Sequence, residues 1–115
     1  MSKGLIICVC QGTCPSFQKM NIFEVMNKIR KEKLFDFVVL HSQLCAEDGD
    51  EFLRTLLANK EIKDLYVAAC DPLMQQKMFK NAFDKSGFNV KKHHAVDIRN
   101  MTTDQAVSAI KKLLK

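Results

Sequence analysis

The sequence of 115 residues contains no tryptophan, one tyrosine, two prolines and four glycines, and it has no long apolar run. No hydrophobic stretch approaches the roughly 20 residues that a membrane-spanning helix needs. The apolar segment at residues 3–10 is too short for a secretory signal, and it lacks a small-residue cleavage site. We therefore expect a cytoplasmic protein that does not enter a membrane.

Glycine-rich nucleotide-binding motifs are also missing. The sequence has neither G-x-G-x-x-G nor G-x-x-x-x-G-K-[ST], and the segment around Gly12 has too few glycines for the backbone to approach a pyrophosphate closely. No arrangement of serine, histidine and aspartate for nucleophilic hydrolysis rises above chance. These absences argue against a nucleotide-binding protein or a serine hydrolase.

The composition is that of a globular protein, with 47% hydrophobic and 27% charged residues. The length fits a single domain over residues 1–115. Lysine and arginine outnumber aspartate and glutamate by 18 to 13, which gives a net charge of +5. This charge suits an anionic partner but is too small to indicate nucleic acid, so no nucleic-acid partner is expected.

Four short apolar runs alternate with helical patterns. They cover residues 5–10, 35–40, 65–70 and, more weakly, 90–98. The first three are nearly continuous in apolar residues, which is typical of strands buried on both faces of a parallel sheet. The fourth is interrupted by lysines and by His93 and His94. It predicts a half-exposed edge strand whose two histidines are solvated.

Helix-boundary residues flank the four amphipathic patterns. The sequence has capping side chains and acidic residues at helix starts, where they bind free N–H groups and complement the helix dipole. It also has a proline at a first helical position and a glycine after a last turn. Thr102 with Gln105 also resembles a capping box. The predicted boundary residues are Ser16 before a first helix containing Phe17, Met20, Phe23, Met26 and Ile29; Glu47, Asp48, Asp50 and Glu51; Asp71 and Pro72; Gly87; and Thr102.

Four alternations of strand and helix predict βαβ units with right-handed crossovers. The expected fold is a single three-layer α/β domain of the Rossmann/flavodoxin-like type. Its four-stranded parallel sheet should have the strand order 2-1-3-4, with helices on both faces. Ligands of such folds bind beyond the carboxyl ends of the strands, where the strand order reverses.

All five cysteines map to that edge of the predicted sheet. Cys8 and Cys10 end the first strand, Cys14 follows in the next loop, Cys45 lies in the loop after the second strand, and Cys70 ends the third. An odd number of cysteines without an export signal favours metal ligation or redox chemistry over structural disulfides. Because neighbouring strands are about 4.8 Å apart, four of these thiols are within reach of one metal cluster.

The spacing of the cysteines narrows the kind of site. Cys8 and Cys10 share one face of a strand, and their Cα atoms would be about 6.6 Å apart, near the upper limit for a disulfide. Cys45 and Cys70 each precede a helix start, where the helix dipole favours a thiolate. No Cys-x-x-Cys occurs, unlike in ferredoxins or zinc fingers. The alternative for any single cysteine is a buried, small apolar side chain.

Several motifs resemble one family. They are Cys8-Val9-Cys10, Leu44-Cys45-Ala46-Glu47-Asp48-Gly49, Val67-Ala68-Ala69-Cys70-Asp71-Pro72, Phe79, Gly87 with Asn89, and Asp97-Ile98-Arg99. Over almost the whole chain, the sequence resembles the N-terminal iron-sulfur domain of the flavin-binding subunit of heterodisulfide reductase. The resemblance implies a [4Fe-4S] cluster bound by Cys8, Cys10, Cys45 and Cys70. It also implies electron transfer in anaerobic metabolism, and a redox partner that is a flavoprotein or another iron-sulfur subunit.

The sequence departs from that family at three points. It contains no flavin-binding domain or ferredoxin-type motif, which leaves an electron carrier or a non-catalytic subunit of an oxidoreductase complex. Cys14 is an additional thiol, either an alternative ligand or a free cysteine. After Cys70 the chain has Asp71-Pro72-Leu73-Met74 where the family tends to have Ser-Pro-Arg and then histidine.

Two other functions remain open from the residues alone. One is a thiol redox sensor or disulfide-exchange protein, in which Cys14 is the nucleophile and Cys10 or Cys70 the resolving thiol. The other is a zinc-binding interaction module. Near the cysteines, His41 is expected to hydrogen-bond around the site or, less commonly, to be a ligand, and Arg99 is expected to form a strand-end salt bridge.

Overall fold

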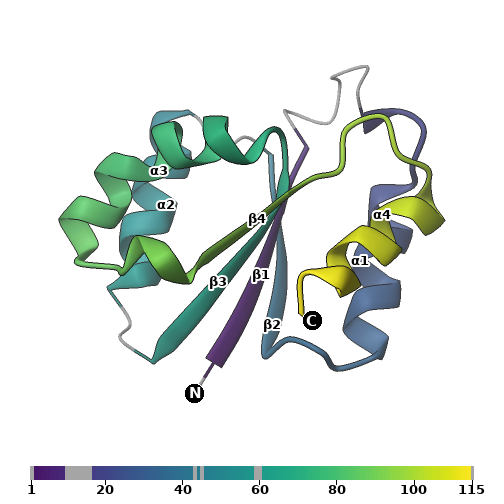
Figure 1. Cartoon of the computed structure of the whole chain (residues 1–115), viewed down its shortest axis with the longest axis horizontal. Helices are drawn as coiled ribbons and strands as arrows, with labels where there is room; N and C mark the ends of the chain where they lie inside the picture. Colours follow the sequence, from purple (N-terminus) through teal and green to yellow (C-terminus); the bar gives the residue numbers. More distant parts are fainter. Residues whose placement is uncertain (1, 10–16, 43, 45, 59–60, 115) are drawn as a thin grey trace.

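The computed structural model describes residues 2–9, 17–42, 44, 46–58 and 61–114, and the structural statements below concern these residues. Strands and helices alternate along the chain (Figure 1). The elements are β1 (Ser2–Cys8), α1 (Ile22–Lys31), β2 (Phe37–His41), α2 (Glu47–Leu57), β3 (Ile62–Ala69), α3 (Pro72–Ser86), the 3-10 turn η3 (Val90–Lys92), β4 (His93–Asp97) and α4 (Thr103–Lys112).

The four strands form one parallel sheet in the order β2-β1-β3-β4, which confirms the predicted topology. Strand β1 lies inside the sheet: Ile6 pairs with Val39 of β2 on one side and with Val67 of β3 on the other. The carboxyl ends of β1, β2 and β3 therefore lie side by side at one edge. None of the described helices is long and apolar enough to cross a membrane.

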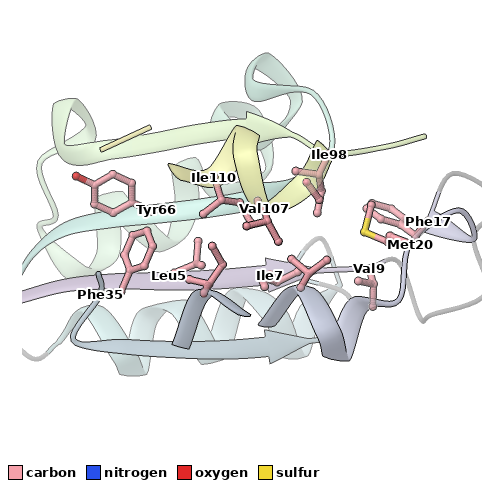
Figure 2. Packing of buried hydrophobic residues seen from close by; sticks show 14 residues of the cluster. Leu5, Ile7, Val9, Phe17, Met20, Phe35, Tyr66, Ile98, Val107 and Ile110 are labelled. Carbon is pink, nitrogen blue, oxygen red and sulfur yellow. The ribbon is translucent and has the colours of Figure 1, made fainter. Parts of the chain in front are cut away.

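Helices cover both faces of the sheet, α1 and α4 on one face and α2 and α3 on the other (Figure 1). Alternate side chains of β1 pack on opposite faces of the sheet. Leu5 and Ile7 belong to a core under α1 and α4, and Ile6 and Cys8 belong to a core under α2 and α3. We call these the α1/α4 core and the α2/α3 core. Figure 2 shows the first of them, in which Leu5 and Ile7 of β1 face Ile110 and Val107 of α4. Burying one such aliphatic side chain contributes about 1.5–3 kcal/mol.

Three of the four helices begin where the sequence predicts. Helix α2 begins within the acidic segment. The Asp71 carboxylate accepts the Leu73 N–H at 2.7 Å before α3, and Gly87 ends that helix with a φ of 74°, a left-handed conformation that favours glycine. Before α4, Thr102 and Gln105 form the reciprocal hydrogen bonds of a capping box. Side-chain caps thus set the starts of α3 and α4.

The start of the first helix differs from the prediction. Helix α1 begins at Ile22, and the Asn21 side chain caps it by accepting the Glu24 N–H at 3.2 Å. The predicted cap, Ser16, lies outside the described residues. Phe17 precedes the helix yet is buried in the α1/α4 core, so its apolar spacing reflects packing and not helix.

The fourth apolar run divides into η3 and β4. Every residue of β4 is half-buried, as predicted for an edge strand. The prediction that His93 and His94 are solvated is wrong, because both residues are half-buried by helix and strand neighbours. His94 stacks on Tyr66 with ring centroids 4.5 Å apart, and its Nε2 lies 3.0 Å from Asp64 Oδ1.

Candidate functional site

Two of the five cysteines, Cys8 and Cys70, belong to the described residues. Cys8 is the last residue of β1, and Cys70 directly follows β3, the neighbouring strand. The two thiols lie at the same edge of the sheet and close enough to interact electrostatically. Cys10, Cys14 and Cys45 lie outside the described residues, so the meeting of four thiols stays a prediction.

The Cys8 thiol is buried and hydrogen-bonded. The backbone N–H of Leu44 donates to Cys8 Sγ with a donor–acceptor distance of 3.2 Å. The hydrogen bond joins residues 36 positions apart and holds the Leu44 backbone against the end of β1. N–H donors of this kind stabilise negative charge on sulfur and are among the contacts that tune metal-bound thiolates.

Gly49 in the first turn of α2 allows Leu44 to approach. A Cβ atom at position 49 would lie 2.3 Å from the Leu44 carbonyl oxygen, so the Leu44 backbone packs directly on the helix. The Leu44 side chain is itself buried in the α2/α3 core. A glycine inside an acidic helix start is a sequence signal for this close contact, and our sequence interpretation missed it.

His41 ends β2 and leans on α2. Its Nε2 atom lies 3.9 Å from Asp48 Oδ2, within ion-pair distance when the imidazole is protonated. Its ring centroid is 5.2 Å from that of Phe52. These contacts place His41 at the predicted edge, and its role toward a metal site stays a prediction.

The environment of Cys70 opposes ionisation of the free thiol. Burial raises the pKa of the Cys70 thiol, and the neighbouring Cys8 and Asp97 add to this rise. The backbone N–H of Cys70 and the positive charge of Arg99 act in the opposite direction. The metal-free thiol therefore stays protonated at neutral pH, whereas a bound metal would displace that proton.

Arg99 forms the strand-end salt bridge that the sequence predicts. Its Nη2 and Nε donate to the two carboxylate oxygens of Asp97 at 2.7 and 3.0 Å, and its backbone N–H donates to Asp97 Oδ1 at 3.0 Å. The side-chain hydrogen bonds from Arg99 hold the pKa of Asp97 below its usual value. The salt bridge fixes a guanidinium group near Cys70.

Gln75 is a further residue of this region that sequence reasoning missed. It is fully buried, and it is the only buried polar side chain among the described residues. Its Nε2 donates to the Cys70 carbonyl oxygen at 2.8 Å, and its Oε1 lies 3.1 Å from His93 Nε2. The signal was available, since Gln75, Phe79 and Phe83 follow one another at helical spacing on the inner face of α3.

His93 completes this polar contact inside an apolar setting. Its ring lies 5.6 Å from that of Phe79 and 5.3 Å from that of Phe83, measured between centroids. Burial, with a smaller contribution from His94, lowers the pKa of His93 to about 4. His93 is therefore neutral at pH 7.

No group of three or more histidine, cysteine or acidic side chains is gathered for a metal ion within the part of the chain that the structure describes. This part contains only two of the five cysteines. The predicted four-cysteine ligand set is therefore untested by this finding.

Comparison with known proteins identifies no relative of this chain. The chain matches no protein-family model, and no curated protein is similar enough to count as a relative. What the structure defines is a class: a parallel α/β domain with thiols at the carboxyl edge of its sheet. The resemblance to the heterodisulfide reductase domain stays a prediction.

Proposed function

We propose that the protein is a small electron carrier that holds a [4Fe-4S] cluster through Cys8, Cys10, Cys45 and Cys70. The observation that carries the proposal is the hydrogen bond from the Leu44 N–H to Cys8 Sγ. It holds Leu44, the residue before Cys45, against the thiol that ends β1. Cys70, directly after β3, lies at the same edge of the sheet.

The described residues suit such a group by their donor chemistry. Thiolates are the ligands that iron-sulfur clusters take in proteins, and Cys8 and Cys70 supply two of them at neighbouring strand ends. Cys10 and Cys45 complete the proposed set, with Cys14 as the alternative ligand or a free thiol. When bound, the cluster supplies the capacity to take up and release one electron.

Charges of both signs lie near the Cys70 thiol. The Arg99 guanidinium favours negative charge on its sulfur, whereas the Asp97 carboxylate opposes it. At Cys8, the Leu44 N–H donates a hydrogen bond to the sulfur. Since local charge and hydrogen bonds to sulfur set the reduction potential of a cluster, these groups are a source of its tuning.

The carrier role needs a redox partner and no substrate chemistry at this edge. The sequence resemblance implies a partner in a heterodisulfide reductase-type complex, either a flavoprotein or another iron-sulfur subunit. In this proposal the protein passes electrons and makes no bond in a substrate itself. It is then a carrier or a non-catalytic component of an oxidoreductase system in the cytoplasm of an anaerobic cell.

Thiol exchange is less well supported by the described residues. An exchange reaction needs a thiolate, and burial raises the pKa of the Cys70 thiol, which lowers its thiolate fraction at neutral pH. Cys14, the nucleophile in that hypothesis, lies outside the described residues. A zinc module would use the same four thiols, and metal analysis distinguishes it from an iron-sulfur protein.

The decisive experiment is anaerobic reconstitution with iron and sulfide, followed by metal and sulfide analysis. We expect brown protein with about four iron atoms per chain and broad absorbance at about 400 nm. Cys45→Ser should lose most of this iron and absorbance, because no other cysteine comes from its loop. Cys14→Ser is the matched control and should keep them.

Colourless protein after reconstitution would contradict the proposal. Zinc in place of iron, with unfolding when zinc is chelated, would favour the interaction module. If Cys14→Ser loses the cluster and Cys8→Ser or Cys10→Ser keeps it, the ligand set is wrong although the carrier role stands.

A further inference from the structure

Gln75 joins three elements of the α2/α3 side. It lies in the first turn of α3, its amide nitrogen donates to the Cys70 carbonyl after β3, and its amide oxygen meets His93 of β4. The same amide nitrogen lies 3.5 Å from the Val96 carbonyl oxygen, also in β4. With no exposed surface, the side chain has no water to replace these partners.

The proton positions in this chain of contacts follow from the chemistry of the groups. The two carbonyl oxygens near the amide of Gln75 accept hydrogen bonds only, so its NH₂ group must face them. Its oxygen then faces His93 and can only accept. Neutral His93 therefore carries its proton on Nε2 and donates it to Gln75 Oε1.

Among the described residues, Gln75 is the side chain that holds the Cys70 carbonyl. Three consecutive carbonyls cross the turn from β3 to α3. The Ala69 carbonyl accepts the backbone N–H of Ile98 at 2.9 Å, and the Asp71 carbonyl accepts the backbone N–H of Gln75 at 3.0 Å. Only the Cys70 carbonyl between them is held by a side chain.

We propose that Gln75 is a positioning residue for Cys70, fixing the peptide of that cysteine, and through it the thiol, at the edge shared with Cys8, while His93 holds Gln75 in place. The proposal deepens the proposed function, in which Cys70 is a cluster ligand. Its structural part, the restraint on Cys70, does not require the cluster.

The restraint should be local. Replacing Gln75 with methionine keeps the length of the side chain but removes both hydrogen-bonding ends. The backbone hydrogen bonds of the Ala69 and Asp71 carbonyls remain, so α3 and β3 stay attached. Of the three carbonyls in the turn, that of Cys70 loses its partner and its peptide gains freedom. The loss of one buried hydrogen bond changes a local opening equilibrium by about three- to tenfold.

The first test uses the full, metal-free, reduced chain and iodoacetamide at neutral pH. Mass spectrometry of the digested protein follows alkylation of Cys70 and Cys8 separately. In Gln75→Met we expect Cys70 to react about three- to tenfold faster, with Cys8 unchanged. Gln76→Met is the matched control, since the neighbouring glutamine is exposed, and it should leave both rates unchanged.

An equal Cys70 rate in the wild type, Gln75→Met and Gln76→Met would overturn the proposal. If Cys8 also reacts faster in Gln75→Met, the variant has loosened as a whole, and His93→Phe takes its place. Phenylalanine keeps the packing with Phe79 and Phe83 but leaves Gln75 without its donor. A faster Cys70 with an unchanged Cys8 then supports the proposal, and an unchanged Cys70 refutes it.

The second test measures the midpoint potential of the reconstituted protein. Solvent reaching a loosened Cys70 stabilises the more negative reduced form, so Gln75→Met should have a higher potential than the wild type and Gln76→Met. A purely structural residue would change the melting temperature without this shift. If no iron binds but Cys70 is released in Gln75→Met, the carrier function fails and the positioning role stands. If iron binds and neither the potential nor Cys70 alkylation changes, the positioning role fails.

Discussion

The two faces of the sheet are packed in different ways. The α1/α4 core consists of apolar and aromatic side chains, with Leu5 and Ile110 fully buried in it (Figure 2). The α2/α3 side includes a hydrogen-bonded thiol at Cys8, the buried amide of Gln75 and a backbone contact at Gly49. The comparison indicates that one face mainly stabilises the fold, whereas the other uses part of its interior to orient the groups at the sheet edge.

The largest effect should come from weakening the α1/α4 core. Ile110→Ala removes a fully buried side chain and leaves a cavity, which should lower the free energy of unfolding by about 2–5 kcal/mol. Urea denaturation followed by circular dichroism measures this loss. Under native conditions, the ratio of Cys70 to Cys8 alkylation rates should stay that of the wild type.

Ser108→Ala, an exposed change on the same helix, is the control and should alter stability by less than about 0.5 kcal/mol. If Ile110→Ala changes the reactivity of one cysteine selectively, the two faces do not act separately, and the comparison is wrong.

A pH-dependent loss of stability should come from the other face. His93 has a pKa of about 4 in the folded protein, below the ordinary value of 6.5, because burial disfavours its charged form. Between pH 6.5 and 4 the unfolded chain therefore binds a proton at this histidine that the folded chain does not. The contribution of neutral His93 to the free energy of unfolding is complete above about pH 6.5 and is lost as the pH falls toward 4. Between pH 7 and 4.5 the wild type should lose roughly 2–3 kcal/mol through this group.

His93→Phe isolates that contribution because phenylalanine does not titrate. Urea denaturation of both proteins at several pH values should show a shallower decline for the variant. If stability falls equally with pH in both proteins, the contacts of His93 with α3 do not keep it neutral, and the hydrogen bond between His93 and Gln75 is absent.

A smaller effect on stability, with a local effect on a thiol, should follow from Gly49→Ala. The new Cβ meets the Leu44 carbonyl and forces the Leu44 backbone away from α2. Overpacking of about 1–3 kcal/mol is partly offset by the better helix propensity of alanine, about 1 kcal/mol, which leaves a net loss of about 1–2 kcal/mol. Breaking the hydrogen bond from the Leu44 N–H to Cys8 Sγ should make Cys8 react faster with iodoacetamide, while the alkylation rate of Cys70 stays unchanged.

Glu51→Ala, an exposed change in the same helix, should alter neither thiol. An unchanged Cys8 in Gly49→Ala, measured under native conditions, would show that Leu44 does not protect this thiol.

Much of the fold follows from local patterns. Apolar runs separated by amphipathic helices predicted the parallel sheet and its strand order, and capping residues such as Asp71 and Thr102 fixed helix starts. The first helix was placed too early, because Phe17 has helical spacing with later residues but packs into the core before Asn21 caps the helix. Periodicity reports which side chains are buried, and it does not by itself report where a helix begins.

The site was predictable only in outline. The cysteines at strand ends pointed to the correct edge for Cys8 and Cys70, since the carboxyl ends of parallel strands share an edge. The histidine pair was misassigned to solvent, because lysines around it suggested exposure. What covers His93 is α3, which no neighbouring residue in the sequence indicates.

By itself, the sequence determined the class of fold and the edge at which Cys8 and Cys70 lie, because strand and helix periods and end-capping side chains act over a few residues. The tertiary structure decided which groups meet there. The Leu44 N–H reaches Cys8 across 36 positions, and Gln75 joins the Cys70 carbonyl to His93 across two elements. Such contacts depend on how closely two backbones approach and which face of a helix turns inward, and both are properties of the packed molecule.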